Sequence, residues 1–411
     1  MQIFASRYLL PIGAPPREDG ALLVENGRIV AVAPRRELAA AHPRAAAVDF
    51  GEAVLLPPLV NAHTHLELSD FPQWAEAAGE AGEPDDFVDW ILRLVRVRRT
   101  LDAAAVQASL AEGLRQSLAA GTGAVGDILT DLTALPAYAG TPLSGRVFAE
   151  VLGVDAARVA ARLAEIAARL TTPPGPALRW GLSPHAPYTL TAATLAQVIA
   201  FARAHQLPLA MHWAETAEEI AFLSKGQGPL AERLYPAAGW SLPANPYLPK
   251  PESLSGLLIH GTHLTAAEIA AIARTGLGVV LCPRSNRRFG EQRAPLAALR
   301  RAGVPLALGT DSRASSPSLS VWDELAFARE WFAGDLDPAA WLEIATMGGA
   351  RALGLGGELG RLSPGMAASF QVLAVPPGAT VATLAEALCA EGQRTLPRAL
   401  YLRGENVLPH P

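Results

Sequence analysis

The feature that most constrains the fold is a series of short apolar runs that nearly all lead into a histidine, an aspartate or a glutamate. Stretches rich in alanine and leucine separate the runs, and apolar residues recur in them at three- and four-residue steps, as in 103–119, 157–170 and 192–205. The runs cover residues 59–60, 123–125, 147–149, 178–182, 207–211, 257–259, 279–281 and 304–308. This alternation predicts βα units and a parallel sheet.

Eight such units within about 300 residues match a (β/α)8 TIM barrel. A doubly wound open sheet would give the same alternation. The polar residues that follow the runs separate the two folds, because an open sheet spreads its strand ends along a line whereas a barrel gathers all eight on one face. Histidines and carboxylates from distant strands can meet only on that face, so we predict a barrel in an α/β protein.

Both ends of the chain read as short strands joined by turns. Residues 21–24 and 28–32 flank the turn signal Glu25-Asn26-Gly27, and further strand-like runs cover 53–56, 370–375 and 399–402. We therefore expect the termini to fold together as one small β-sandwich. The expected boundaries are 1–58 for its N-terminal part, 59–357 for the barrel and 358–411 for its C-terminal part.

Composition excludes several other classes of protein. Of 411 residues, 50% are hydrophobic and 18% charged, which argues against a disordered chain or a coiled coil. The net charge of −5 argues against a nucleic-acid partner. No secretory signal and no apolar stretch of membrane-spanning length is evident, so we expect a cytoplasmic protein. Cys282 and Cys389 are expected to be buried thiols.

Histidines at the ends of the runs indicate a metal site. His63 and His65 are two residues apart, so on an extended strand both rings face one side. Alone, such a pair could equally be two solvated or core histidines. However, five of the nine histidines end predicted strands, which favours metal binding. These are His63, His65, His185, His212 and His260.

Two carboxylates complete the predicted chemistry. Asp311 ends the eighth run, where it can join three imidazoles around a metal and leave one position open for water. Its alternative role is an N-cap. Glu215 lies three residues after His212, at the step from strand to helix, and can shuttle protons beside the metal. Its alternative role is a first-turn carboxylate favoured by the helix dipole.

A single metal is preferred over a pair. The chain has only two lysines, Lys225 and Lys250, and neither ends a predicted strand, so no lysine is placed to bridge two ions. Glu150, at the end of the third run, is the one alternative bridging ligand that the sequence offers.

These motifs together resemble the amidohydrolase superfamily, in its deaminase and chlorohydrolase branch, over nearly the whole chain. The matching segments are Pro57 to Glu67, His212-x-x-Glu215, His260, Cys282-Pro283-Arg284-Ser285-Asn286, Gly309-Thr310-Asp311-Ser312 and the re-entry segment Gly360 to Ala368. Within that branch, His63 to Ser69, Phe87 to Ile91 and Cys282 to Asn286 are most similar to aminodeoxyfutalosine deaminases of menaquinone biosynthesis.

The resemblance implies one divalent metal per subunit, Zn²⁺ or alternatively Fe²⁺. Its ligands would be His63, His65, His212 and Asp311. Glu215 would shuttle protons, His260 would orient the attacking hydroxide, Asp311 would accept the water proton, and Glu67 and His185 would contact the substrate. Hydroxide would attack C6 of an adenine nucleoside derivative and release ammonia. Homodimers occur among relatives.

The substrate is left with alternatives. The alternative activities are deamination of S-adenosylhomocysteine, methylthioadenosine or guanine, chlorohydrolysis, and cyclic-amide hydrolysis. A barrel that has lost its catalytic activity is disfavoured, because every expected metal ligand is present in the sequence. Residues 87–90 could form a lid over the purine or the buried side of a helix. Four arginines near the predicted mouth could pair with a benzoate tail, or face solvent: Arg284, Arg287, Arg288 and Arg313.

Overall fold

Eight parallel strands form the barrel, in sequence order around one sheet. The computed structural model describes residues 1–243, 247–392 and 396–408. The strands are β6 (Leu59–Thr64), β7 (Thr122–Leu129), β8 (Ser144–Val151), β9 (Leu178–Pro184), β10 (Leu209–Trp213), β11 (Gly256–His260), β12 (Gly278–Leu281) and β13 (Leu306–Leu308). Each contains or overlaps one predicted run, so the (β/α)8 barrel is confirmed.

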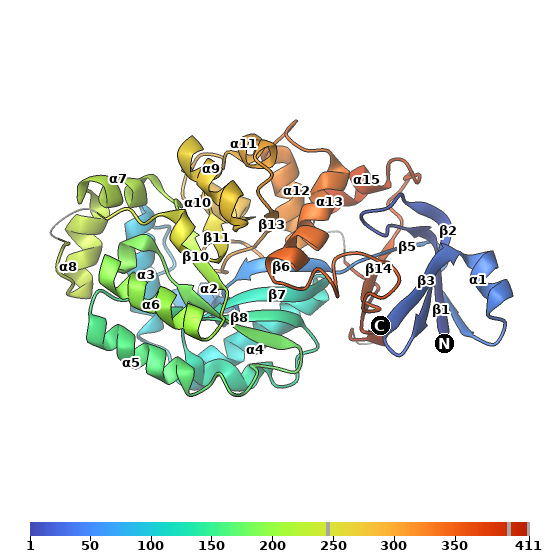
Figure 1. The fold of residues 1–411 in the computed structure, drawn as a ribbon, viewed down its shortest axis with the longest axis horizontal. Coiled ribbons are helices and arrows are strands. Elements are labelled where there is room, and N and C mark those ends of the chain that lie inside the picture. The colour runs from blue at the N-terminus through green and yellow to red at the C-terminus, as the bar shows by residue number, and fades with distance from the viewer. Residues whose placement is uncertain (244–246, 393–395, 409–411) are drawn as a thin grey trace.

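Helices follow the strands and cover the outside of the barrel (Figure 1). The principal ones are α4 (Ala103–Ala119), α5 (Ala156–Ala167), α6 (Ala192–Ala204), α7 (Ala217–Lys225), α9 (Ala266–Thr275), α10 (Pro283–Arg288), α11 (Leu296–Arg301) and α12 (Val321–Trp331). The shorter ones are α8 (Tyr235–Ala238), α13 (Pro338–Glu343) and α14 (Gly349–Ala352). Before α4, the long connection after β6 adds α2 (Phe71–Ala77) and α3 (Phe87–Arg98).

Helix α4 illustrates how local sequence produces these elements. Asp102 precedes it, and its carboxylate accepts the backbone N–H of Ala105 at 2.8 Å, which satisfies one of the free amides of the first turn. Its buried residues Val106, Leu110 and Leu114 recur at four-residue steps and face the barrel. The predicted helix over 103–119 is thus confirmed with its bounds.

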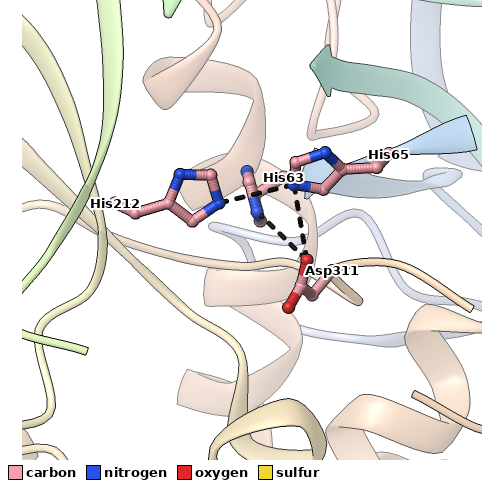
Figure 2. Close-up of side chains that lie close together, drawn as sticks. All are labelled: His63, His65, His212 and Asp311. Atoms are coloured by element: carbon pink, nitrogen blue, oxygen red, sulfur yellow. Dashed lines mark hydrogen bonds and ion pairs between the residues drawn. The ribbon is translucent and has the colours of Figure 1, made fainter. Parts of the chain in front are cut away.

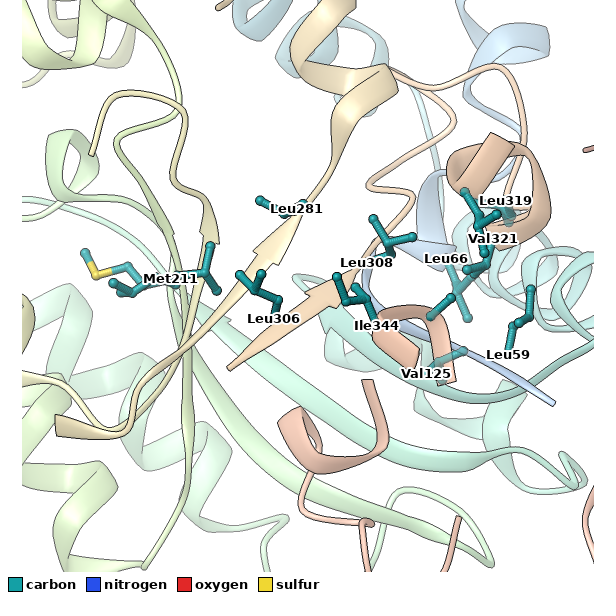
Figure 3. Packing of buried hydrophobic residues seen from close by; sticks show 14 of the residues in the cluster. Leu59, Leu66, Val125, Met211, Leu281, Leu306, Leu308, Leu319, Val321 and Ile344 are labelled. Carbon is teal, nitrogen blue, oxygen red and sulfur yellow. The ribbon is translucent and has the colours of Figure 1, made fainter. Parts of the chain in front are cut away.

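Alternate residues of the barrel strands pack on two sides of the sheet. Leu59, Val125 and Met211 belong to the cluster between strands and helices (Figure 3). Their neighbours Val60 and Ala124 belong to a second cluster, which draws residues from strands all around the sheet and so lies inside the barrel. The interior is therefore filled with side chains, and free space for a ligand occurs beyond the strand ends.

A second sheet combines both ends of the chain, as predicted. Its order is β16-β15-β14-β5-β1-β2-β3, with β4 paired to β1. Its strands are β1 (Gln2–Leu9), β2 (Arg17–Glu25), β3 (Arg28–Pro34), β4 (Ala46–Asp49), β5 (Ala53–Leu56), β14 (Phe370–Ala374), β15 (Ala399–Leu402) and β16 (Glu405–Asn406). Helices α1 (Arg35–Ala41) and α15 (Leu384–Glu391) belong to the terminal segments. Figure 1 shows strands from both ends of the chain in this one sheet, with β14 next to β5.

The terminal sheet is joined across the chain by β5 and β14, which pair antiparallel with Leu55 opposite Val372. The β2–β3 hairpin turns at Asn26 and Gly27, whose φ values of 50° and 70° are those of the tight turn predicted there. The boundaries at 58/59 and 357/358 stay predictions. Cys282 and Cys389 are both buried and free. Within the described residues, no helix combines the length and apolarity needed to cross a membrane.

Candidate active site

Four predicted ligands meet at the carboxyl end of the barrel (Figure 2). His63 lies in β6, His65 directly follows it, His212 lies in β10, and Asp311 follows β13. The Nε2 atoms of His63 and His65 are each 3.5 Å from Asp311 Oδ1, and His65 Nε2 is 3.4 Å from His212 Nε2. One potential ligand atom from each of the four residues lies within 4.8 Å of the others. Strands from opposite ends of the barrel sequence are thus brought to one point.

The protonation of these imidazoles suits a metal. His212 Nδ1 lies 2.9 Å from the carbonyl oxygen of His185, so Nδ1 carries the proton and the Nε2 lone pair faces the cluster. Burial, followed by the charge of His63, lowers the pKa of His65 to about 4, which keeps its ring neutral at pH 7. Within the described chain, neither ring nitrogen of the buried His63 has a hydrogen-bond partner. Buried polar atoms are normally partnered, so three nitrogens and one carboxylate oxygen fit a Zn²⁺-type ion.

Asp311 is held from both sides. Its Oδ1 faces the histidines, and its Oδ2 accepts the hydroxyls of Ser285 at 2.6 Å and Ser315 at 2.8 Å. The backbone of Asp311 is in the left-handed region, with φ of 57°, which is uncommon outside glycine and typical of functional sites. Burial would raise the pKa of this carboxyl, but the surrounding histidines hold it well below its usual range.

The first and last strands of the barrel close on one another at this cluster. The Asp311 N–H donates to the His63 carbonyl at 3.1 Å. The side chain of Asn61 donates to the Thr310 hydroxyl at 2.8 Å and accepts the Thr310 N–H at 3.0 Å. A Cβ at Gly309 would lie 2.7 Å from the His63 carbonyl oxygen, so glycine permits this approach. Sequence reasoning assigned Asn61 no role, although a buried amide within a strand is a signal of such a clasp.

Glu215 and His260 form a second group beside the ligands. Glu215 Oε1 lies 3.4 Å from His260 Nε2, and both residues come within 4.8 Å of Asp311. Burial, then the charges of Asp311, Glu219 and Glu291, raises the pKa of Glu215 well above its usual value. A carboxyl whose pKa is raised in this way can hold a proton and act as an acid.

His260 is turned toward the site by its backbone. Leu258 packs outside the barrel and Ile259 inside, so simple alternation would direct His260 outward. Its φ of 73° breaks that alternation. The side-chain amide of Asn286 donates to His260 Nδ1 at 3.1 Å, which places the ring proton on Nε2, toward Glu215. Burial lowers the pKa of His260 to about 3, so the ring is neutral.

Glu219 supports the turn that carries Glu215, and sequence reasoning missed it. Its Oε1 accepts the N–H of Ala214 at 3.1 Å and its Oε2 accepts the N–H of Glu215 at 2.8 Å. Ala214 has a φ of 50°, so this turn is strained and needs such support. The available signal was a second glutamate four residues after Glu215 in the first turn of α7.

A cavity of about 500 Å³ opens above these groups. We call its strand-end surface the floor; it contains His65, His212, Glu215 and Asp311. We call the facing surface of α3 the wall. The wall is apolar. Residues 87–90 are helical and partly buried, and Phe87 and Trp90 also border the cavity, so the lid over the purine stays a prediction. The wall residues are Phe87, Trp90, Ile91, Leu94 and Val95, followed by Arg98 and Arg99.

The two predicted substrate contacts also border the cavity. His185 Nδ1 lies 3.0 Å from the Thr189 hydroxyl. Glu67 is buried; one of its oxygens pairs with Arg98 and the other accepts the Asp131 N–H at 3.0 Å. Both oxygens of Glu67 are therefore already engaged, and its role as a direct substrate contact stays a prediction.

The four arginines considered for a benzoate tail do not border this cavity as the described residues form it. Arg284 is directed into the protein, where its Nε donates to Glu324 at 2.6 Å. Arg288 pairs with Glu83 at 2.6 Å. The arginines that border the cavity are Arg98 and Arg99, because the segment after β6, rather than the segments after β12 and β13, supplies the wall.

Comparisons with known proteins agree with this geometry. The sequence model described as "Amidohydrolase family" matches residues 54–392. The chain is 34% identical to the aminodeoxyfutalosine deaminase of Deinococcus radiodurans over 360 residues, 82% of each protein. It is 31% identical to a 5-methylthioadenosine/S-adenosylhomocysteine deaminase of Nitratidesulfovibrio vulgaris over 87% of this chain and 79% of that protein. The crystal structure of Helicobacter pylori aminofutalosine deaminase superimposes with a TM-score of 0.83 at 22% identity, covering 99% of this chain and 100% of the other.

Proposed function

The chain belongs to the amidohydrolase family, and on that basis we propose that it is a metal-dependent hydrolytic deaminase of an adenine nucleoside derivative, with 6-aminodeoxyfutalosine as its substrate. The observation that carries the proposal is the joint arrangement on the floor. A cluster suited to one metal lies beside a buried, proton-retaining carboxyl and a neutral histidine, under a cavity large enough for a nucleoside.

In this proposal His63, His65, His212 and Asp311 hold one divalent ion, Zn²⁺ rather than Fe²⁺ on its nitrogen-rich donor set. Bound there, such an ion lowers the pKa of water to about 7 and supplies a nucleophile at neutral pH. The boundaries of the domain that carries these ligands are proposed as residues 59–357.

The remaining groups move protons. Asp311 accepts a proton from the attacking water, and the hydroxyls on its Oδ2 keep the carboxylate oriented. Glu215 delivers its proton to the ring nitrogen next to the amino-bearing carbon and recovers one from the new hydroxyl group as that group becomes a carbonyl, while Asp311 passes the water proton to the leaving amine. His260 orients the attacking oxygen by donating a hydrogen bond from its Nε2–H. Water is consumed, ammonia leaves, and the amino group of the purine is replaced by a carbonyl oxygen.

The relatives support two substrates. Similarity to the D. radiodurans protein favours aminodeoxyfutalosine, and a role in menaquinone biosynthesis follows if that substrate is correct. The second candidate is 5-methylthioadenosine or S-adenosylhomocysteine, favoured by the N. vulgaris protein. We propose that His185, which borders the cavity, contacts the purine and that Glu67 contributes by holding Arg98.

Ammonia release tests the proposal. Purified protein loaded with Zn²⁺ is assayed with aminodeoxyfutalosine, methylthioadenosine, S-adenosylhomocysteine and guanine, with chelator-treated protein as control. We expect turnover of aminodeoxyfutalosine at the highest kcat/KM and none after metal removal. Turnover of another nucleoside instead would support the proposed deamination but replace aminodeoxyfutalosine as the substrate. No ammonia from any of them would contradict the proposal and favour chlorohydrolysis.

A further inference from the structure

The wall of the cavity changes character at its C-terminal end. Phe87, Trp90 and Leu94 follow one another at three- and four-residue steps and Ile91 lies next to Trp90, so they form one stripe along α3. The next position on that stripe is Arg98, and Arg99 borders the cavity beside it. At 1.5 Å per residue, the stripe runs about 16 Å from Phe87 to Arg98. An apolar surface of this length therefore ends in two positive charges.

We propose that Arg98 and Arg99 bind a carboxylate at the end of the substrate's sugar-linked substituent, and that the substituent itself lies along the apolar stripe. This deepens the proposed function and rests on it. The site thereby selects purine nucleosides with an apolar, anionic tail over those with an uncharged or zwitterionic one.

The charges around the cavity leave an anion one place to bind. The carboxyl groups that border it are Glu67, Glu150, Glu215 and Asp311. Arg98 and Arg99 are the two permanently cationic side chains that the described residues place on its surface. In the proposed function the metal position is occupied by the attacking water and the purine, so beyond it these two arginines are the favourable partners for an anionic tail. The ammonium of an amino-acid tail would be repelled at the same place.

Arg98 is fixed in position with donors to spare. Its Nη1 pairs with the buried Glu67, whose second oxygen is tied to the backbone of Asp131. A guanidinium has five N–H donors, and the structure uses one of them in this pair. Glu67 thus holds the guanidinium at the cavity without consuming its capacity to bind a planar carboxylate.

Arg99 supplies a positive charge at the cavity that no carboxylate of the described residues neutralises. Its side chain is exposed, and it makes no ion pair or side-chain hydrogen bond with the part of the chain that the structure describes. Glu67 offsets the charge of Arg98, so an incoming carboxylate meets a net positive charge chiefly through Arg99. Arg99 is consequently the cleaner position for a test, because changing it leaves the Glu67 pair intact.

The experiment compares a benzoate-tailed substrate with its carboxamide counterpart, which keeps the shape and removes the charge. kcat/KM is measured for both with wild type, Arg99→Gln and Arg96→Gln. Arg96 is the matched control, because it lies on the same helix, does not border the cavity, and pairs with Glu80 through two bonds of 2.6 and 2.8 Å. Affinity for the deaminated, benzoate-tailed product is measured calorimetrically on the same proteins.

We expect Arg99→Gln to lower kcat/KM for the carboxylate substrate about tenfold to a hundredfold, mainly through KM, and to abolish the preference over the carboxamide. Arg96→Gln should keep the wild-type preference. Equal loss on both substrates, or a wild type without preference, overturns the inference while the deaminase proposal stands. Product binding that depends on Arg99 in a protein without turnover overturns the proposed function and keeps the anion site.

Discussion

The floor and the wall of the cavity are built in different ways. The floor residues sit at the ends of strands or directly after them and are held by buried partners, as Asp311 is by Ser285 and Ser315. The wall is one face of α3, a helix inserted between the first and second barrel strands. Its polar ties lie mostly nearer the surface: Arg233 pairs with Asp86 and Asp89, Arg96 pairs with Glu80, and Trp90 Nε1 donates to the Ala314 carbonyl at 2.9 Å, whereas the Arg98 pair with Glu67 reaches a buried partner.

This difference separates two tasks. In the proposed function, groups on the floor act on the atoms that react, which every substrate of this kind shares, so changes there should reduce kcat for all of them. Groups on the wall would touch the part of the substrate that varies, so changes there should alter KM and selectivity. The following variants test that division, beginning with the largest effect.

Asp311→Asn should abolish turnover. The amide cannot accept a proton from the attacking water and is a poorer metal ligand, so we expect kcat to fall by about 10³-fold or more on every substrate. Circular dichroism and thermal melting check that the fold is kept, and metal analysis reports the loss of affinity. Activity within tenfold of wild type would refute the role assigned to Asp311.

Glu215→Gln should lower kcat by about 10²- to 10⁴-fold with the metal content unchanged, because it removes an acid and not a ligand. Glu218→Gln, three residues along the same segment, is the control and should retain activity. If the Glu215→Gln variant loses its metal, Glu215 is a ligand instead. A loss confined to one substrate would contradict the division between floor and wall.

Trp90→Ala should raise KM about tenfold while kcat changes by less than threefold, since it removes apolar contact area and the bond to Ala314. Trp90→Phe keeps an aromatic side chain in the wall without that hydrogen bond, so its KM should lie between the KM of wild type and that of Trp90→Ala. Steady-state kinetics on two nucleosides measures both effects. A fall in kcat as large as that of Glu215→Gln would show that the wall takes part in the chemical step.

Asp127 lies behind the floor, and its effect should be on stability rather than on turnover. Its carboxyl accepts the Leu66 N–H at 2.8 Å and the Tyr138 hydroxyl, and burial raises its pKa to about 8. Because this pKa is raised on folding, its contribution to stability is complete below about pH 4 and is lost as the pH rises to about 8.

Asp127→Asn removes that pH dependence, since an amide cannot ionise. Relative to wild type, the variant should gain melting temperature between pH 5 and pH 8, equivalent to a few kcal/mol at the upper end. Thermal melts of both proteins across this range measure the difference. Parallel curves would mean that Asp127 is already ionised in the folded protein.

The floor could be predicted from the sequence because periodicity locates strand ends and barrel closure brings them together. Position at the strand ends indicated five histidines and Asp311, and the family resemblance selected His63, His65 and His212 among them. The wall could not, because the spacing of Phe87, Trp90 and Leu94 shows that they share a face but not what that face covers. The same limit misdirected attention to Arg284 and Arg288 and away from Arg98 and Arg99.

The contacts that support the floor residues could not be predicted from the sequence either. The bonds from Ala214 and Glu215 to Glu219 depend on a left-handed backbone that no local pattern announces. The clasp between Asn61 and Thr310 depends on closure of the whole barrel. Each of these residues is of a common type for the helix or strand in which it lies, and its role is evident only from its hydrogen-bond partner in the folded structure.

The contact that closes the barrel also determines when, during folding, the cluster of metal-ligand candidates can form. Asn61 and Thr310 are 249 positions apart, and Asp311 reaches His63 across the same junction. During synthesis, β6 therefore cannot form this contact until β13, the eighth strand, has left the ribosome. Closing so long a loop is entropically costly and slow, so the reactive centre is assembled among the last events of folding. A chain interrupted just before residue 311 would hold the three histidines without the carboxylate that completes the cluster.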